Sequence, residues 1–105
     1  MSKALWVVLV PTVHSDTGKP IRVRHHRVWD AKVRAITGGL TILHPAKGQW
    51  ISPDGVLFAE RMIPVQIMCT ASQIEEIATM TGTYYKQLAV MYYKVSDEVK
   101  IKEIK

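Results

Sequence analysis

The first apolar positions of this chain are consecutive rather than spaced. Residues Ala4–Val13 are rich in β-branched and aromatic side chains, and the run is too continuous to bury only one face. It therefore predicts a central strand of a sheet. A loop of turn-forming residues, Ser15–Pro20, follows the strand.

Beyond that loop the spacing of apolar positions becomes helical. Trp29, Val33 and Ile36 recur at intervals of four and three residues, and charged residues occupy much of the rest of the turn. The pattern predicts a helix over residues 23–37. Two glycines follow it, and glycine accepts the left-handed backbone that commonly ends a helix.

The middle of the chain has the composition of strands and turns. Short strands are predicted over Leu40–His44 and Gln49–Ser52. The Pro53–Gly55 segment is a turn, and a long strand over Val56–Thr70 follows it. Pro64 lies within this strand and cannot donate a ladder hydrogen bond, so it indicates a sheet edge or a bulge.

Helical spacing then returns over residues 72–87. Ser72 and Glu75 have the spacing of a capping box at the start of this helix. Gly82 weakens the helix without ending it. One face is expected to face the core, and its members are Ile74, Ile77, Ala78, Thr81 and Tyr85.

A last strand is predicted over Ala89–Val95, before a charged tail. The order strand, helix, strand, strand, helix, strand is that of the α+β ferredoxin-like unit, βαββαβ, with four antiparallel strands and two helices on one face. We expect residues 1–105 to form one such domain. Two helices cannot cover both faces of so apolar a sheet, so we also expect a homo-oligomer.

Charge and cysteine content narrow the classes of function. The net charge of +5 favours acidic ligands, but no block of five basic residues is present, so nucleic acid is not an expected partner. The single cysteine, Cys69, lies among apolar residues and excludes a disulfide framework, which favours a core thiol in a reducing cytoplasm. The first apolar run ends at Pro11, too short to span a membrane and without a signal-peptide cleavage site.

Histidines and arginines raise the question of metal and anion sites. The chain contains four histidines, but no carboxylate or cysteine accompanies them at ligand spacing, so no metal is expected. Arg22, Arg24, His25, His26 and Arg27 gather at the start of the first helix. A phosphate or carboxylate could dock there, although a solvated basic face is the more ordinary interpretation.

Glu60 is the sharpest candidate for chemistry. It lies among apolar residues in a strand expected to be buried, where a carboxylate must pair, face water or meet a ligand. A ligand and a cross-strand ion pair with Lys or Arg remain equal alternatives. Trp50 could stack on a base or hold a cation, or it could simply pack in the core. Tyr92 and Tyr93 point to opposite faces, so we expect one in the core and one free.

Short motifs in the middle of the chain resemble a group of small phage and bacterial proteins of unassigned function. The motifs, in order, are Gly38–Thr41, Gly48–Trp50, Asp54-Gly55 and Glu60. The chain also resembles the phage S-adenosylmethionine lyases, formerly called SAM hydrolases. The similar features are a valine-rich first strand, Arg24-His25 opening a helix, a glycine-led hairpin with Glu60-Arg61, and the segment Tyr84–Lys94.

The resemblance to the lyases implies a ferredoxin-like homotrimer with active sites between subunits. In that family the carboxylate of the substrate attacks its own γ-carbon and expels methylthioadenosine, leaving homoserine lactone, with no cofactor or metal. It implies catalytic roles for Glu60 and Tyr92. It implies substrate contacts from Arg24, Gln49, Trp50, Ser52 and Tyr84. Among these, Trp50 would provide a surface for adenine. The expected location is the cytoplasm, that of the host if a phage encodes the chain.

Two other classes of function remain open from the residues. The chain could be a non-enzymatic oligomeric module that binds a nucleotide or another anion, which suits its positive charge. It could also be a phage or host-interaction protein that uses its open sheet face against a macromolecule. Formation of methylthioadenosine from S-adenosylmethionine would separate the enzyme from both.

Overall fold

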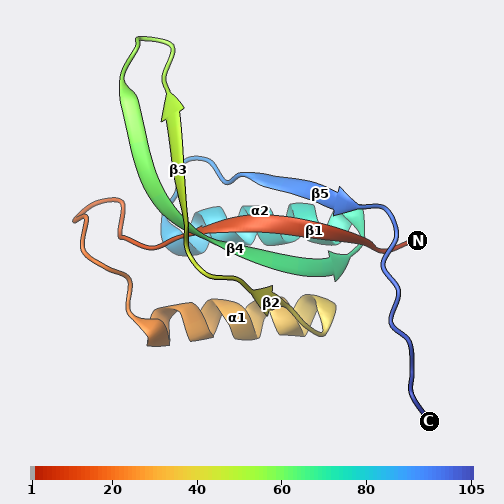
Figure 1. Ribbon diagram of the computed structural model, residues 1–105. Helices are drawn as coiled ribbons and strands as arrows, with labels where there is room; N and C mark the ends of the chain where they lie inside the picture. Colours follow the sequence, from red (N-terminus) through yellow and green to blue (C-terminus); the bar gives the residue numbers. More distant parts are fainter. Residues whose placement is uncertain (1) are drawn as a thin grey trace.

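The strand predicted first lies inside the sheet. In the computed structural model, which describes residues 2–105, β1 (Ala4–Pro11) lies between β4 (Leu57–Cys69) and β5 (Tyr92–Ser96) and pairs antiparallel with both. The other edge of β4 pairs with β2 (Thr41–Ile42) and β3 (Ala46–Ile51), also antiparallel. Figure 1 shows this sheet with both helices. The predicted α+β ferredoxin-like fold is confirmed.

The sheet has five strands instead of four because the strand after the first helix is broken. Ile42 pairs with Val65 but Ala46 pairs with Met62, so four steps on one side match three on the other. One extra residue therefore bulges between β2 and β3. Pro64 lies opposite this break, where its carbonyl accepts a hydrogen bond from the Leu43 N–H at 3.0 Å. The prediction that this proline marks an edge or a bulge is confirmed.

The two helices lie close to their predicted bounds and bury the predicted faces. Helix α1 (Val23–Thr37) buries Trp29 and Val33, and it ends at Gly38 in the left-handed conformation, φ 89°. Helix α2 (Ala71–Tyr85) buries all five residues predicted for its core face. In Figure 1 both helices lie against the same sheet, α1 below it and α2 behind it.

The capping box of α2 uses different residues from those predicted. The Thr70 hydroxyl accepts a hydrogen bond from the Gln73 N–H at 3.2 Å, and the Gln73 amide oxygen accepts one from the Thr70 N–H at 2.9 Å. The prediction of Ser72 and Glu75 was wrong because β4 ends at Cys69, so the extended residue before the helix is Thr70.

Trp29 links the helices inside the core. Its indole N–H donates to the Thr81 hydroxyl at 2.9 Å, and that hydroxyl donates to the Ile77 carbonyl at 2.6 Å. Cys69 is fully buried, which confirms the core interpretation, and burial raises the pKa of its thiol. The hydrogen bonds of Trp29 and Thr81 fix α1 against α2.

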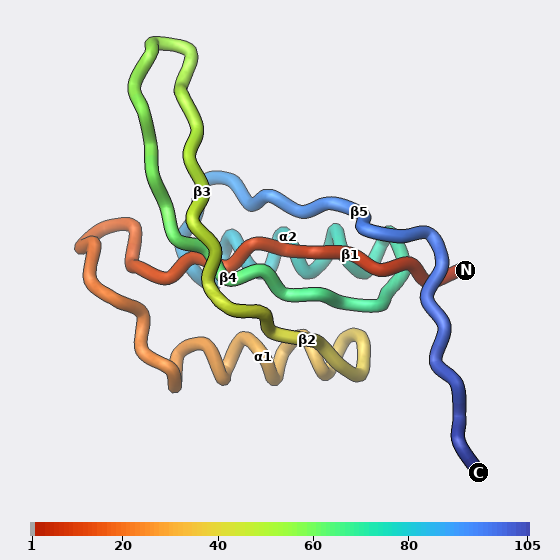
Figure 2. The backbone as a smooth tube through the Cα atoms, viewed as in Figure 1, coloured from red at the N-terminus to blue at the C-terminus, as the bar shows by residue number. Residues whose placement is uncertain are grey.

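The hairpin formed by β3 and the first part of β4 projects away from the rest of the molecule (Figure 2). We call residues 46–61 the arm. Every residue of β3 and of 57–61 is exposed. The expectation that Glu60 lies in a buried strand was therefore wrong, and Trp50, 49% exposed, is not a core residue of this chain. The large apolar residues exposed on the arm are Trp50, Ile51, Val56, Leu57 and Phe58.

The last strand also differs from its prediction. β5 begins at Tyr92, three residues later than expected, and both Tyr92 and Tyr93 are exposed. Neither is a core residue, because β5 is an edge strand and most of its residues lie outside the packed centre. The Tyr92 ring lies 6.2 Å from that of Trp6. Within residues 2–105, no helix has the length and apolarity needed to cross a membrane.

Candidate functional site

Glu60 shares one face of the arm with an aromatic pair. The register pairs Glu60 with Gly48 and Phe58 with Trp50, and positions two apart on a strand point to the same face. The Trp50 and Phe58 rings stack with centroids 4.6 Å apart and planes 14° apart. Because Gly48 has no side chain, nothing opposite covers the Glu60 carboxylate. A flat aromatic surface and an open carboxylate thus lie on the same side of the hairpin.

An open cavity of about 430 Å³ lies where the arm joins the body, and we call it the arm-base cavity. Glu60 and Arg61 line it from the arm, and Thr12 and Ser15 from the segment after β1. The Thr12 hydroxyl donates to the Arg61 carbonyl at 2.8 Å, and the Ser15 hydroxyl donates to the Lys86 carbonyl at 3.1 Å. These hydrogen bonds hold the walls together.

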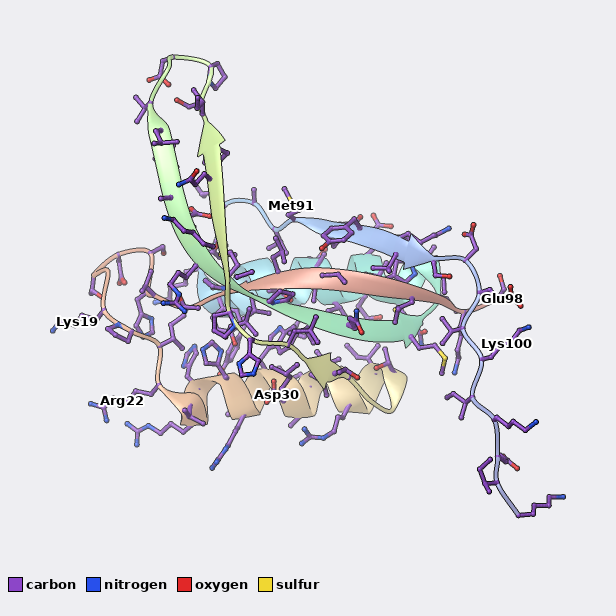
Figure 3. All side chains as sticks on the ribbon, viewed as in Figure 1. Lys19, Arg22, Asp30, Met91, Glu98 and Lys100 are labelled. Atoms are coloured by element: carbon purple, nitrogen blue, oxygen red, sulfur yellow. The ribbon has the colours of Figure 1, made fainter. Side chains whose placement is uncertain are left out.

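Glu60 has no ion-pair partner in the described chain. The salt bridges among residues 2–105 join Lys94 to Asp97 and Lys100 to Glu98, and Figure 3 labels the second pair near the C-terminus. The cross-strand ion pair considered from the sequence is therefore not formed within residues 2–105. An exposed, uncompensated carboxylate in a cavity is able to meet a cationic ligand group.

The other arm residues predicted to contact substrate lie differently. Gln49 pairs with Ala59, so it points to the opposite face from Glu60. Ser52 lies at the tip, where its hydroxyl bonds the Asp54 carboxylate and accepts a hydrogen bond from the Val56 N–H at 3.2 Å. Of these predicted contacts on the arm, Trp50 is the one that lies on the same face as Glu60.

Arg24 and Tyr84 line a different cavity, of about 520 Å³, which we call the basic cavity. The Tyr84 hydroxyl donates to the backbone carbonyl of His25 at 2.7 Å, and the two rings lie 4.6 Å apart. The Tyr84 ring therefore lines the cavity, while the hydrogen bond from its hydroxyl anchors α1. Sequence reasoning found the arginines here, but missed His14 and Lys19, which the loop brings alongside them.

Tyr92 lines neither cavity. It lies beside Trp6, and the Lys94 ammonium lies 5.2 Å from the Trp6 ring centroid. A single copy of the chain thus distributes the predicted residues over the arm, the basic cavity and the outer strand. No group of three or more His, Cys, Asp or Glu side chains within residues 2–105 is arranged to hold a metal ion.

A histidine–tyrosine pair, formed by a half-buried His26 and a buried Tyr85, lies beside the basic cavity. The His26 Nδ1 and the Tyr85 hydroxyl are 2.6 Å apart. Burial lowers the pKa of His26 from 6.5, against the opposing effect of Asp30 and with smaller lowering effects from His25 and His14. Burial also raises the pKa of Tyr85, with smaller contributions from Tyr84 and Asp30. Both shifts favour neutral partners joined by one hydrogen bond.

We expect the protein to lose stability as pH falls below about 7, from the usual histidine pKa toward the lower pKa of folded His26. The unfolded chain binds a proton at His26 more readily than the folded one, so the stabilisation present above pH 6.5 is lost toward the lower folded pKa. Burial raises the pKa of Asp30, so this carboxyl adds stability as pH falls, which is opposite to the effect of His26. The contribution of Asp30 lies at lower pH than that of His26. Urea unfolding at several pH values should therefore give a flatter profile for His26→Asn.

The control for this prediction is His44→Asn, which removes an exposed histidine. This variant should keep the pH slope of the unsubstituted protein. Equal slopes for all three proteins would contradict the role given to His26.

No protein-family model matches the chain, and no curated protein matches it in sequence. Solved structures do match in fold. A phage SAM lyase in complex with S-methyl-5′-thioadenosine superposes with a TM-score of 0.67 at 11% identity, covering 91% of this chain and 82% of that chain.

Two divalent cation tolerance proteins are equally similar in fold. The periplasmic CutA of Archaeoglobus fulgidus gives a TM-score of 0.67 at 9% identity, covering 95% of this chain and 88% of that chain. The Cut A1 protein of Thermus thermophilus gives 0.64 at 8% identity, covering 98% of this chain and 87% of that chain. At these identities the similarity establishes the fold shared by all of them, and it does not choose between their activities.

Proposed function

We propose that this protein is an S-adenosylmethionine lyase that acts as a homo-oligomer. The observation that carries the proposal is the open carboxylate of Glu60, without an ion-pair partner, on the same face of the arm as the Trp50–Phe58 stack. S-adenosylmethionine has a flat adenine at one end and a cationic amino-acid part at the other. The similar fold of a phage SAM lyase supports the same assignment.

The reaction needs only the substrate. One oxygen of its carboxylate forms a bond to the γ-carbon while the bond from that carbon to sulfur breaks. The electron pair goes to sulfur, which becomes the neutral thioether of methylthioadenosine, and the ammonium group keeps its charge in homoserine lactone. Because the nucleophile and leaving group belong to one molecule, the protein contributes chiefly by holding a folded substrate pose.

In this proposal the aromatic stack and Glu60 bind different parts of the substrate. The aromatic stack supplies a surface for adenine, and Glu60 supplies negative charge for the amino-acid part. An interaction with the ammonium group persists through the reaction, whereas one with the sulfonium weakens as its charge is neutralised. Glu60 beside the ammonium therefore binds the substrate and orients its carboxylate without being lost in the transition state.

The proposal places the active site between copies of the chain. The arm extends from the body with its apolar side chains exposed, so a neighbouring copy is needed to enclose its ligand. Arg24, Tyr84 and Tyr92 lie elsewhere on the same chain, and they join the site only if a neighbour brings them to the arm. The number three for the assembly rests on the resemblance to the lyases alone.

Incubation with S-adenosylmethionine tests the activity directly. We expect methylthioadenosine and homoserine lactone in equal amounts, measured by liquid chromatography with mass spectrometry. If the purified assembly forms neither product, the lyase proposal fails and a non-enzymatic oligomeric module that binds a nucleotide or another anion takes its place.

Glu60→Gln should lower kcat/KM at least about tenfold, equivalent to roughly 1.4 kcal/mol of lost transition-state stabilisation. The amide keeps the size of the side chain but removes its charge, and Glu60 is exposed, so fold and assembly should be unchanged. Glu76→Gln is the matched control, since it makes the same change at an exposed position on α2. Full activity in folded Glu60→Gln would remove this residue from the mechanism.

A further inference from the structure

The basic cavity has a lining of one electrostatic sign. Its ionisable members other than Tyr84 are Lys19, Arg22, Arg24, His14 and His25, and no carboxylate is among its lining residues. The remaining lining comes from Pro20, Val28 and the Tyr84 ring. A concave surface with several cationic donors and an apolar floor is suited to an anion attached to an organic group.

The cationic side chains of this cavity form no salt bridge within residues 2–105. Neither salt bridge of the described residues involves Lys19, Arg22 or Arg24. Figure 3 shows Lys19 and Arg22 at the end of the molecule where the loop reaches α1, while Asp30 lies further along the helix. Several cations held near one another repel, and a bound anion would relieve that repulsion.

The loop that carries part of the cavity is held in place by backbone hydrogen bonds. The His14 N–H donates to the Lys19 carbonyl and the Gly18 N–H to the His14 carbonyl, both at 2.8 Å, and the Ile21 N–H donates to the Thr12 carbonyl at 2.9 Å. Gly18 takes the positive φ of 71° that the turn requires.

Contacts between aromatic rings also hold the side chains of the basic cavity in place. The His14 ring lies edge-on to the His25 ring at 5.7 Å, and the His25 ring packs at 4.6 Å from that of Tyr84. The Tyr84 hydroxyl in turn donates a hydrogen bond to the His25 carbonyl in the backbone of α1. The cavity is therefore formed before any ligand arrives, which reduces the entropy lost on binding.

We propose that the basic cavity binds a small phosphorylated ligand. Two arginines favour phosphate, because the planar guanidinium matches its oxygens with paired donors. The volume of about 520 Å³ exceeds that of a phosphate group and leaves room for an organic part against Val28 and Tyr84. Within one copy of the chain this site is separate from the arm-base cavity, and binding of phosphate to it does not depend on cleavage of S-adenosylmethionine.

Inorganic pyrophosphate is a suitable probe, because it carries the anionic part alone. We expect saturable binding to the full chain at low ionic strength, measured by calorimetry. In ¹⁵N-labelled protein the amide shift changes should concentrate in residues 14–28 and around Tyr84. Unsaturable binding, or shift changes spread over all basic residues, would refute the site.

A pair of double variants separates this site from general attraction by the net charge. Arg22→Gln with Arg24→Gln should weaken pyrophosphate binding at least about tenfold. Lys32→Gln with Arg34→Gln removes the same charge from exposed positions further along α1, and it should change affinity less than about twofold. Equal losses in both would mean that pyrophosphate senses only overall charge, and the proposal would fail. Neither measurement uses S-adenosylmethionine, so the lyase proposal stands or falls separately.

Discussion

Trp29→Ala should destabilise the protein by about 3–5 kcal/mol, as expected for loss of a large buried aromatic side chain. Trp29 is 1% exposed, and it is hydrogen-bonded to Thr81 and lies 6.4 Å from the Tyr85 ring. Its removal leaves a cavity at the junction of both helices. Because total stability of a domain this size is about 5–15 kcal/mol, much of the population could unfold at 37 °C.

Urea unfolding at one fixed protein concentration measures this effect. Val28→Ala is the control, since the neighbouring valine is 49% exposed and its truncation should cost less than about 0.5 kcal/mol. Trp29→Phe should fall between the two, because it keeps a ring but loses the indole hydrogen bond. A change below about 1 kcal/mol for Trp29→Ala would contradict the central role of this side chain.

Truncating the aromatic stack of the arm, Trp50→Ala with Phe58→Ala, should convert the assembled protein largely to monomer. An isolated two-stranded hairpin is only marginally stable in water, and this one exposes five large apolar side chains. In the proposed assembly a second copy packs against these side chains and leaves open the part of the Trp50–Phe58 stack that faces the substrate. If each aromatic contributes about 2 kcal/mol as an interface anchor, the pair changes the association constant roughly a thousandfold.

Sedimentation at micromolar concentration distinguishes the outcomes, since the monomer has a mass of 11.9 kDa. Leu88→Ser with Ile104→Ser is the control, because both residues are exposed apolar side chains outside the arm. Assembly should persist in that control. An unsubstituted protein that sediments as a monomer, or an arm variant that remains assembled, would rule out this interface.

The residues that the sequence placed well are those whose environment depends on local spacing. Trp29, Val33 and the five core positions of α2 recur with the period of a helix, so their burial follows once a sheet lies on one side. Pro64 is similar, because its missing N–H constrains any strand that contains it. The α+β ferredoxin-like order followed from these periods and from the turns between them.

The arrangement of the candidate site depends on which strands pair and in which register, and the spacing of residues along the sequence does not specify this. Glu60 lies among apolar neighbours, and in sequence these resemble a buried strand. They are exposed because β4 extends beyond the end of its partner β1 and continues into the arm. There β4 pairs with β3 alone among the described strands. The same pairing places Glu60 with Trp50 and turns Gln49 to the other face.

The basic cavity likewise combines residues that are visible as a cluster in the sequence with residues that only the fold brings to them. The arginines at the start of α1 are visible as a cluster in the sequence, but Tyr84 is 59 residues beyond His25, and the loop carrying His14 and Lys19 could have folded elsewhere. Side-chain periodicity therefore determined the elements of this protein and their buried faces. Strand register and loop closure determined which exposed groups meet, because these depend on contacts between distant parts of the chain.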